Sequence, residues 1–335
     1  TPCPTQPLLQ DRVAIDWGPD GKLWVWEMHD YPSGTDNNWQ PGGRVKFLED
    51  RDGDGKYEQA TVFGEGLPFP TGLMAWKGGM IICAAPDIFF ARDENGDGKA
   101  DKIEKLFSGF ATDNYQARVN SPTLGLDNWI YAANGLLGGN IVPQKNSLLR
   151  TDGVSAVDIR GRDIRISPKT GVLETVSGLT QFGRARDDWG NWFGCDNTRL
   201  LLHIPWPEKY MKRNPHVAPP NPIRLTTGPN GNRLYPTSRL MERFNDPDYA
   251  NRVTSAGGIG IYRDTHLGEE FYGNVFTCEP VHNLVHREVL SGELVFLSAR
   301  PTDEQESEFL SSRDHWFRPV QARTEDILFP ELAST

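Results

Sequence analysis

The sequence lacks the patterns that define several large classes of protein. It has no apolar run near the roughly 18 residues that a membrane-spanning helix requires. It has no cluster of lysine and arginine that would follow a phosphate backbone, and its net charge is -10. It also has no Cys-x-x-Cys pair and no Cys-x-x-Cys-His haem attachment. We therefore expect no membrane span, no nucleic-acid partner, no cysteine-rich zinc site and no covalently bound haem.

Cysteine is scarce, with four residues at Cys3, Cys83, Cys195 and Cys278. Four cysteines allow three pairings, so one or two disulfides would suit an oxidising compartment without a defined connectivity. Free thiols buried in an apolar core fit the same spacing equally well. The sequence leaves both arrangements open.

Helical periodicity is nearly absent. Most of the chain consists of short β-branched or aromatic runs separated by Gly, Pro, Asn and Asp. The 34 Gly and 25 Pro fit a fold that is rich in turns. The one segment that favours a helix is the acidic stretch 304–312.

The short runs recur as hairpins. Residues 13–17 lead through an Asp-Gly turn into 23–26, and 44–48 lead through an acidic turn into 60–63, which makes one four-stranded antiparallel unit. Similar runs follow at 72–76, 80–83, 88–91, 103–107, 123–126, 129–132, 163–166 and 173–176, with further starts near Arg184, Thr254 and Trp316. A repeat of roughly 50 to 70 residues is typical of propeller blades. We therefore expect an all-β fold in a single domain over 1–335, a β-propeller of five to six four-stranded blades with the last blade shortened.

Two acidic turns, at 50–58 and 93–101, carry the strongest chemical signal. Both match the D-x-[DN]-x-D-G opening of a calcium loop. Calcium takes about six to eight oxygen ligands, and the Gly at position 6 allows the reversal that brings them together. The expected ligands are side chains at positions 1, 3, 5, 9 and 12 and the carbonyl at position 7: Asp50, Asp52, Asp54, Lys56, Glu58, Asp93, Asn95, Asp97, Lys99, Asp101 and Glu104. No helices flank these loops, so we expect calcium-bound outer hairpins with a structural role; the alternative is an acidic turn without an ion.

Eight segments carry a family resemblance: VAIDWGPDG (13–21), EMHDYP (27–32), LPFPTG (67–72), AAPDI (84–88), NYQARVN (114–120), RDDWGNWFG (186–194), CEPVHNLVHR (278–287) and HWFRPV (315–320). Together they resemble a bacterial family described as membrane-bound dehydrogenase domains, which are often fused to a c-type haem domain. The propeller of that family is similar to soluble quinoprotein glucose and sorbosone dehydrogenases. The resemblance implies a funnel at one end that holds pyrroloquinoline quinone with a calcium ion.

The chain departs from that family in two respects. It has no haem-binding segment, so the resemblance implies an external cytochrome as electron acceptor. After 320–324 the family continues into a Gly-Pro-Asp-Gly hairpin, whereas this chain reads EDILFP at 325–330. The last blade is therefore expected to be shortened, rebuilt or missing, with five blades or an open seam. The resemblance, the calcium loops and the cysteines together predict a periplasmic or extracellular protein.

Polar residues next to strand starts are the candidates for a site near the axis. Arginines suit a ligand with several carboxylates, and a His beside an Asp suits a general base near neutral pH. The expected catalytic residues are His29, Asp30, Arg118, Arg184, Asp188, His282 and His286. The expected cofactor-binding residues are Arg118, Asn120, Arg184, Arg287 and Arg318. The structural alternatives are that the arginines pair with Asp residues between blades, and that the histidines and the 188–192 turn only satisfy local hydrogen bonds.

Three functions fit these residues. The first is a quinone- and calcium-dependent dehydrogenase that oxidises a sugar or a related small-molecule alcohol. The second is a propeller that binds a glycan or a protein and uses calcium as a structural clamp. The third is a polysaccharide lyase or hydrolase, in which a His or Tyr base works beside an arginine that neutralises a uronate.

Overall fold

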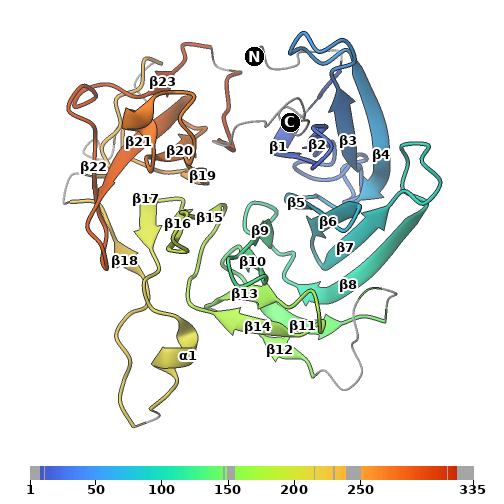
Figure 1. Ribbon diagram of the computed structural model, residues 1–335, viewed down its shortest axis with the longest axis horizontal. Coiled ribbons are helices and arrows are strands. Elements are labelled where there is room, and N and C mark those ends of the chain that lie inside the picture. The colour runs from blue at the N-terminus through green and yellow to red at the C-terminus, as the bar shows by residue number, and fades with distance from the viewer. Residues whose placement is uncertain are drawn as a thin grey trace, which may run out of the picture.

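Five antiparallel sheets of four to six strands form a ring in the described part of the chain (Figure 1). The computed structural model describes residues 8–10, 12–145, 148, 155–214, 216–228, 231–238, 250–314 and 316–322. Each sheet is one blade whose first strand lies innermost, so the fold is the expected β-propeller. Five blades are present, and no sixth sheet occurs among these residues.

The strands follow one another outward from the axis. Blade 1 contains β1 (Arg12–Trp17), β2 (Leu23–Glu27), β3 (Gly43–Glu49) and β4 (Gln59–Leu67). Blade 2 contains β5 (Gly72–Trp76), β6 (Gly79–Ala84), β7 (Asp87–Arg92) and β8 (Lys102–Phe110). Blade 3 contains β9 (Asn120–Leu124), β10 (Ile130–Ala133), β13 (Asp163–Ile166) and β14 (Leu173–Val176). Blade 4 contains β15 (Arg184–Arg186), β16 (Trp192–Asp196), β17 (Arg199–His203) and β18 (Arg224–Leu225). Blade 5 contains β19 (Gly257–Ile261), β20 (Val275–Glu279), β21 (Leu284–Ser291) and β22 (Leu297–Ala299).

Helix is confined to two short segments of the described chain, α1 (Glu208–Met211) and a 3-10 turn at Glu269–Phe271. The helix expected over 304–312 was wrong. That segment forms turns and a short strand, β23 (Leu310–Ser311), which pairs with β21. The reason is tertiary: Glu304 and Glu308 turn inward and form ion pairs with basic side chains of blade 5, and these contacts outweigh the local preference for helix.

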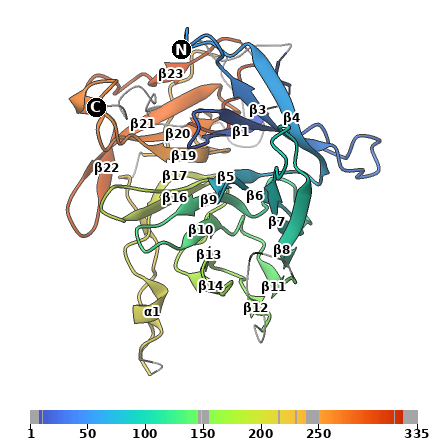
Figure 2. The same ribbon diagram turned by 45° about the vertical axis from the view of Figure 1, so that its right-hand side comes forward.

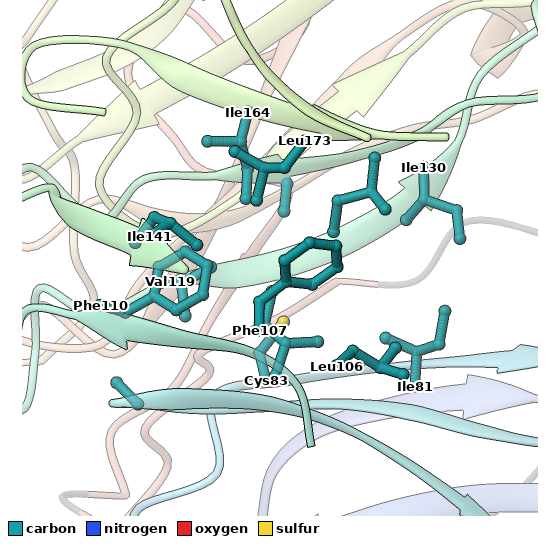
Figure 3. Close-up of a cluster of buried hydrophobic side chains, with 14 of the residues drawn as sticks. Ile81, Cys83, Leu106, Phe107, Phe110, Val119, Ile130, Ile141, Ile164 and Leu173 are labelled. Carbon is teal, nitrogen blue, oxygen red and sulfur yellow. The ribbon is translucent and has the colours of Figure 1, made fainter. Parts of the chain in front are cut away.

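Two further strands, β11 (Gly139–Pro143) and β12 (Val157–Asp158), are inserted between the second and third strands of blade 3. They do not extend blade 3. Instead, β11 pairs with β8 and adds two strands to the outer edge of blade 2. Figure 3 shows the result: Phe107 of blade 2, Ile130 and Ile164 of blade 3 and Ile141 of β11 contribute to one buried cluster. The insertion therefore joins two blades around one apolar core.

The inner strands are joined around the axis by hydrogen bonds between neighbouring blades. The Thr71 hydroxyl donates to the Val119 carbonyl at 2.6 Å, and the Gly258 N–H donates to the Phe182 carbonyl at 2.8 Å. Blades 5 and 1 are joined in a different way, because segment 320–322 lies between their inner strands and makes hydrogen bonds to both. The N–H of Ala322 donates to the Gly258 carbonyl at 3.1 Å. On the other side, the Ile15 N–H donates to the Gln321 side chain at 2.9 Å.

These bonds settle the expected form of the last blade. Blade 5 has its four strands, and the segment after Trp316 forms no strand in the described residues. It fills the seam between β19 and β1 instead. Gly258 makes this approach possible, because it has a φ of 59° and a Cβ there would lie 2.1 Å from the Val320 carbonyl oxygen.

The two ends of the propeller carry different connections. We call the end where the chain enters each inner strand the loop end; it includes the connections at 28–42, 111–119, 177–183 and 280–283. The opposite end is the hairpin end, with the turns at 50–58, 93–101, 125–129 and 187–191. Both predicted calcium loops thus lie at the hairpin end, between β3 and β4 of blade 1 and between β7 and β8 of blade 2.

The three cysteines in the described residues are buried free thiols: Cys83, Cys195 and Cys278. Burial raises the pKa of Cys83 and of Cys195 to about 12. These thiols therefore stay protonated at neutral pH and act as small apolar residues of the core. Cys3 lies outside the described residues.

Candidate functional site

Asp30 lies in the 28–42 connection at the loop end and is fully buried. Its Oδ2 accepts the backbone N–H of Phe69 at 2.7 Å and that of Gly42 at 3.2 Å. Phe69 belongs to the segment that enters β5, so Asp30 connects blade 1 to blade 2. The other oxygen, Oδ1, is buried and has no hydrogen-bond partner among the described residues. Native proteins rarely leave such an atom unsatisfied.

Arg118 approaches Phe69 from the next blade. Its guanidinium lies 4.6 Å from the centre of the Phe69 ring, and Nη2 donates to the Thr112 carbonyl at 3.0 Å. The Nε atom is buried and has no partner. Burial lowers the pKa of Arg118, and the negative charge of Asp30 opposes this shift. One acceptor and one donor without partners thus belong to two side chains that both contact Phe69, Asp30 through the backbone N–H of Phe69 and Arg118 through its ring.

Exposed aromatic rings surround this pair. Trp39 is 56% exposed and Tyr31 is 49% exposed, although both are large apolar side chains. The Trp39 ring lies 5.7 Å from that of Phe69 and 6.3 Å from that of Tyr115, which meets Tyr31 edge-on at 5.0 Å. Trp39 and Phe69 have φ values of 65° and 43°, a conformation that is strained for such residues and concentrates at binding sites. We call Tyr31, Trp39, Phe69, Tyr115, Asp30 and Arg118 the loop-end cluster.

His29 neighbours this cluster but is engaged by other charges. Its Nε2 lies 2.9 Å from Glu27 Oε2 and 2.7 Å from Arg44 Nη2. Glu27 is fully buried and also contacts Lys46 Nζ at 2.9 Å. Burial alone would raise the pKa of Glu27, yet hydrogen bonds from Gln10, His29 and Lys46 hold it below its ordinary value. His29 is therefore part of an ion-pair group around a carboxylate that the sequence analysis did not single out.

Asn120 and Arg184 are built into the junction of blades 3 and 4. The Asn120 amide donates to the carbonyls of Arg118 and Gln181, and its oxygen accepts the Gly183 N–H at 3.0 Å. Arg184 is buried and pairs with Asp163 at 2.5 Å. The alternative that Arg184 pairs with an Asp between blades is thus confirmed. Neither residue belongs to the loop-end cluster.

His282 and Arg318 shape the loop end of blade 5. His282 Nδ1 lies 2.8 Å from Glu279 Oε2, which also accepts the backbone N–H of His282 at 2.8 Å. Burial would raise the pKa of Glu279, but the His282 hydrogen bonds lower it below its ordinary value. Arg318 Nη1 donates to the carbonyls of Pro280 and Val281 at 2.6 and 3.1 Å. The His282 side chain therefore contacts the end of β20, and Arg318 contacts the 280–283 turn.

His286 and Arg287 lie within blade 5, on opposite faces of β21. His286 is buried, with Nδ1 2.7 Å from Glu308. Burial would lower its pKa, but Glu288 and Glu308 raise it above the ordinary value. Arg287 pairs with Glu304 at 2.9 Å and lies over the Phe271 ring at 4.5 Å. These residues link blade 5 to the segment that follows it.

Asp188 lies at the hairpin end, in the turn between β15 and β16. It accepts a hydrogen bond from the Tyr272 hydroxyl at 2.7 Å and pairs with Arg263 at 2.9 Å. Burial would raise the pKa of Asp188, but these two partners lower it. Of the seven expected catalytic residues, only Asp30 and Arg118 therefore join the loop-end cluster, with His29 beside it. The aromatic members were missed, although Tyr31 and Phe69 stand in the segments that carried the family resemblance.

The first acidic loop has the geometry of a cation site. One carboxylate oxygen from each of Asp50, Asp52, Asp54 and Glu58 falls within 4.8 Å of all the others. Oxygens around one calcium ion at about 2.3–2.6 Å can be at most about twice that distance apart, so this set fits a single ion. Lys56 Nζ contacts Asp54 at 2.7 Å and lowers the pKa of that carboxyl.

The second acidic loop repeats the backbone of the first. Asp93 accepts the N–H groups of Gly96 and Gly98 at 2.6 and 2.8 Å, as Asp50 accepts those of Gly53 and Gly55 at 2.7 and 2.8 Å. These amides lower the pKa of Asp93. At the remaining positions, Asn95 contacts Asp101, while Asp97 accepts the Lys99 N–H. Glu104 lies within β8, 3.4 Å from Lys102, so it is part of the strand and not of the turn.

The fold and the two loops define a five-bladed β-propeller with acidic hairpins at one end and an aromatic cluster at the other. The chain belongs to the family described as Domain of unknown function (DUF7133), whose model matches residues 3–325. No curated protein gave a match. None of the helices in the described ranges has the length and apolar character of a transmembrane span.

Several solved structures share a similar arrangement. One is a protein from Thermus thermophilus described as an oxidoreductase (glucose dehydrogenase), with 16% identity, a TM-score of 0.49 and coverage of 93% of this chain and 87% of that one. Another is a luciferin-regenerating enzyme, at 9% identity and a TM-score of 0.46, covering 86% and 76%. A third is virginiamycin B lyase from Staphylococcus aureus, at 11% identity and a TM-score of 0.40, covering 89% and 72%. At this distance none of them indicates what this chain does.

Proposed function

We propose that the protein binds a sugar or a related polyhydroxy alcohol at the loop-end cluster. One observation carries the proposal: Asp30 Oδ1 and Arg118 Nε are both buried without a partner among the described residues, on two side chains that contact Phe69. A buried polar atom without a hydrogen bond costs about 1–3 kcal/mol. A ligand that both accepts and donates hydrogen bonds recovers this energy, and neighbouring hydroxyl groups do both.

The aromatic side chains favour a sugar over a simple alcohol. Trp39 and Tyr31 are half-exposed, and Trp39 packs against Phe69, which both polar side chains contact. Ring faces pack against the apolar C–H face of a sugar, while the polar side chains fix its hydroxyls. Asp30 in its charged form would also accept a proton from a bound hydroxyl.

The quinone stays a prediction from the resemblance. A tricarboxylate needs several cationic groups around one space. In this structure Arg184 is held by Asp163, Arg287 by Glu304 and Arg318 by two carbonyls, and Asn120 is fully hydrogen-bonded. Only Arg118 lies in the loop-end cluster. The residues do not form the expected clamp, so we derive no step through a quinone.

We propose further that each acidic loop binds one calcium ion with a structural role. The support is the oxygen geometry of the first loop and the matching backbone of the second. Both loops lie at the hairpin end, whereas the proposed sugar site lies at the loop end, so the ions would stabilise hairpins and take no part in binding at the loop-end cluster. Loops of this kind fill where calcium is abundant, which supports a periplasmic or extracellular location.

The sugar proposal is tested by isothermal titration calorimetry with glucose, xylose, galactose, mannose and sorbitol. Trp39→Ala and Arg118→Lys are compared with Trp316→Ala, which removes an equally large side chain that is 91% exposed. We expect Trp39→Ala to weaken binding about tenfold, Arg118→Lys to weaken it because the unpaired Nε donor is lost, and Trp316→Ala to leave it unchanged. Failure of every sugar to bind, or equal binding by Trp39→Ala and wild type, would contradict the proposal. Dye reduction by the bound sugar after addition of pyrroloquinoline quinone and calcium would show the dehydrogenase activity that the resemblance implies.

A further inference from the structure

A second candidate site lies at the hairpin end, between blades 3 and 4. A groove of about 750 Å³ runs between β13 and β14 of blade 3 and the β17–β18 connection of blade 4. That connection carries α1 and projects from the ring (Figures 1 and 2). A smaller pocket of about 440 Å³ lies between blades 4 and 5. Trp189, in the turn between β15 and β16, lines both of them.

Exposed aromatic side chains line both pockets. Trp189 is 82% exposed, and Tyr210 and Trp206 of the projecting connection are 59% and 40% exposed. Tyr272, which lines the smaller pocket, is 47% exposed. Large aromatic side chains are normally withdrawn from water because they bury a large apolar area. Four of them along adjoining pockets indicate a surface that receives a ligand.

The groove also contains polar atoms without partners. Ser177 Oγ, Arg184 Nε and Glu208 Oε2 line it, and none of these three atoms has a hydrogen-bond partner within the described ranges of the chain. Their side chains are almost completely buried: Ser177 is 5% exposed, and the side chains of Arg184 and Glu208 are 2% and 10% exposed. Arg184 uses Nη1 for Asp163, which leaves Nε available on the same guanidinium. The three atoms comprise a hydroxyl, a donor and an acceptor.

Most of the remaining charges of the groove are held in ion pairs, and Lys209 lies over the Tyr210 ring at 5.0 Å. Arg165 pairs with Glu174 at 2.7 Å and with Asp127 at 3.2 Å, and Lys212 pairs with Glu208 at 2.6 Å. A strongly charged ligand would have to break these pairs. A neutral ligand rich in hydroxyl groups would leave them in place, satisfy the three unpaired atoms and stack on the exposed rings.

We infer that the two pockets form one binding track for a neutral glycan, an extended chain of sugar residues that crosses Trp189. The chain-like form of the ligand follows from the shape, because a single sugar would fill only one of the two pockets. The track is separate from the loop-end cluster and requires no residue of it. A propeller with both sites would hold a polymer at its hairpin end and a small sugar at its loop end.

The test uses neutral hexasaccharides of glucose, xylose and mannose, with glucose as the short ligand and polygalacturonate as the charged one. Binding is measured by affinity electrophoresis and by calorimetry on the full chain. We expect at least one hexasaccharide to bind more than tenfold tighter than glucose does, measured in the Trp39→Ala variant so that binding at the loop-end cluster is weakened. Polygalacturonate should bind more weakly than that hexasaccharide.

Two substitutions locate the binding. Trp189→Ala should weaken hexasaccharide binding about tenfold, because the ring shared by both pockets is lost. Ser177→Ala should weaken it by a smaller factor, and the exposed control Trp316→Ala should have no effect. The inference is overturned if no neutral hexasaccharide binds, if Trp189→Ala binds like the wild type, or if Trp316→Ala weakens binding as much as Trp189→Ala does.

Discussion

The seam between blades 5 and 1 gives a prediction whose size follows from the structure. Gly258→Ala places a Cβ 2.1 Å from the Val320 carbonyl oxygen and 2.4 Å from Gln321 Cα. The left-handed φ costs about 1 kcal/mol for a residue with a side chain. The clash with the main chain of 320–322 should also break the hydrogen bonds of Ala322 and Gln321, each of which contributes about 1 kcal/mol. The total expected loss is about 3 kcal/mol.

Gly273→Ala is the matched control in the same blade. Its φ is 76°, and a Cβ there meets no atom within 4 Å, so only the backbone strain of about 1 kcal/mol applies. For a chain of this size the unfolding entropy is about 0.7 kcal/mol per degree, so Gly258→Ala should melt about 4 °C below the wild type and Gly273→Ala about 1.5 °C below it. Differential scanning calorimetry measures both. If the two variants melt at the same temperature, residues 320–322 do not hold the seam and the reasoning is wrong.

Two further outcomes are expected. Chelation of calcium should lower the melting temperature, because each filled site adds about 2.7 kcal/mol to the stability when free calcium is about 100 times the Kd. Asp52→Asn or Asp97→Asn should each remove about half of that shift, whereas the control Asp20→Asn, in a turn outside the loops, should leave it unchanged. A melting temperature that does not change on chelation would exclude the ions. Burial lowers the pKa of His203 to about 4, below its unfolded value of 6.5, so the unfolded chain binds the proton first and stability should be lost as the pH falls from 6.5 to 4. His203→Phe retains the stacking on Phe193, and its free energy of unfolding should fall by about 3 kcal/mol less than that of the wild type between pH 6.5 and 4. Urea denaturation measures both, and an equal loss of stability in the two proteins would refute this.

The blades could be predicted from the sequence because their signals are local. The Asp-Gly turn after Trp17 and the acidic turns at 50–58 and 93–101 each stand between two strand-like runs, and all became hairpins. The insertion β11–β12 was missed, because its strands are short and β11 pairs with a distant strand: Gly139 of β11 lies opposite Phe110 of β8, 29 residues earlier in the chain. The acidic segment 304–312 was misjudged for the same reason, because the partners of its carboxylates come from blade 5.

The candidate site shows the same limit. Positions next to strand starts indicated Asp30 and Arg118, which the topology brings to one end of the ring. Local sequence did not show which arginines form ion pairs. Arg184, for example, pairs with Asp163, which lies 21 residues earlier in the chain and contacts Arg184 only when blades 3 and 4 pack together. Nor could it show that Trp189 would remain in water, since an exposed and a buried tryptophan carry the same signal in a turn-rich sequence.

The hairpin β11–β12 also restricts how this ring can be rearranged. Propellers are built from repeated units, and a repeat that contacts only its neighbours can be duplicated or deleted one at a time. Here the sequence of blade 3 supplies the outer edge of blade 2, so a gene segment that encodes either blade alone would leave β8 without its outer partner or β11 without a sheet. Blades 2 and 3 are therefore expected to be inherited as a pair, and the smallest intact unit that contains either of them is the stretch from β5 to β14.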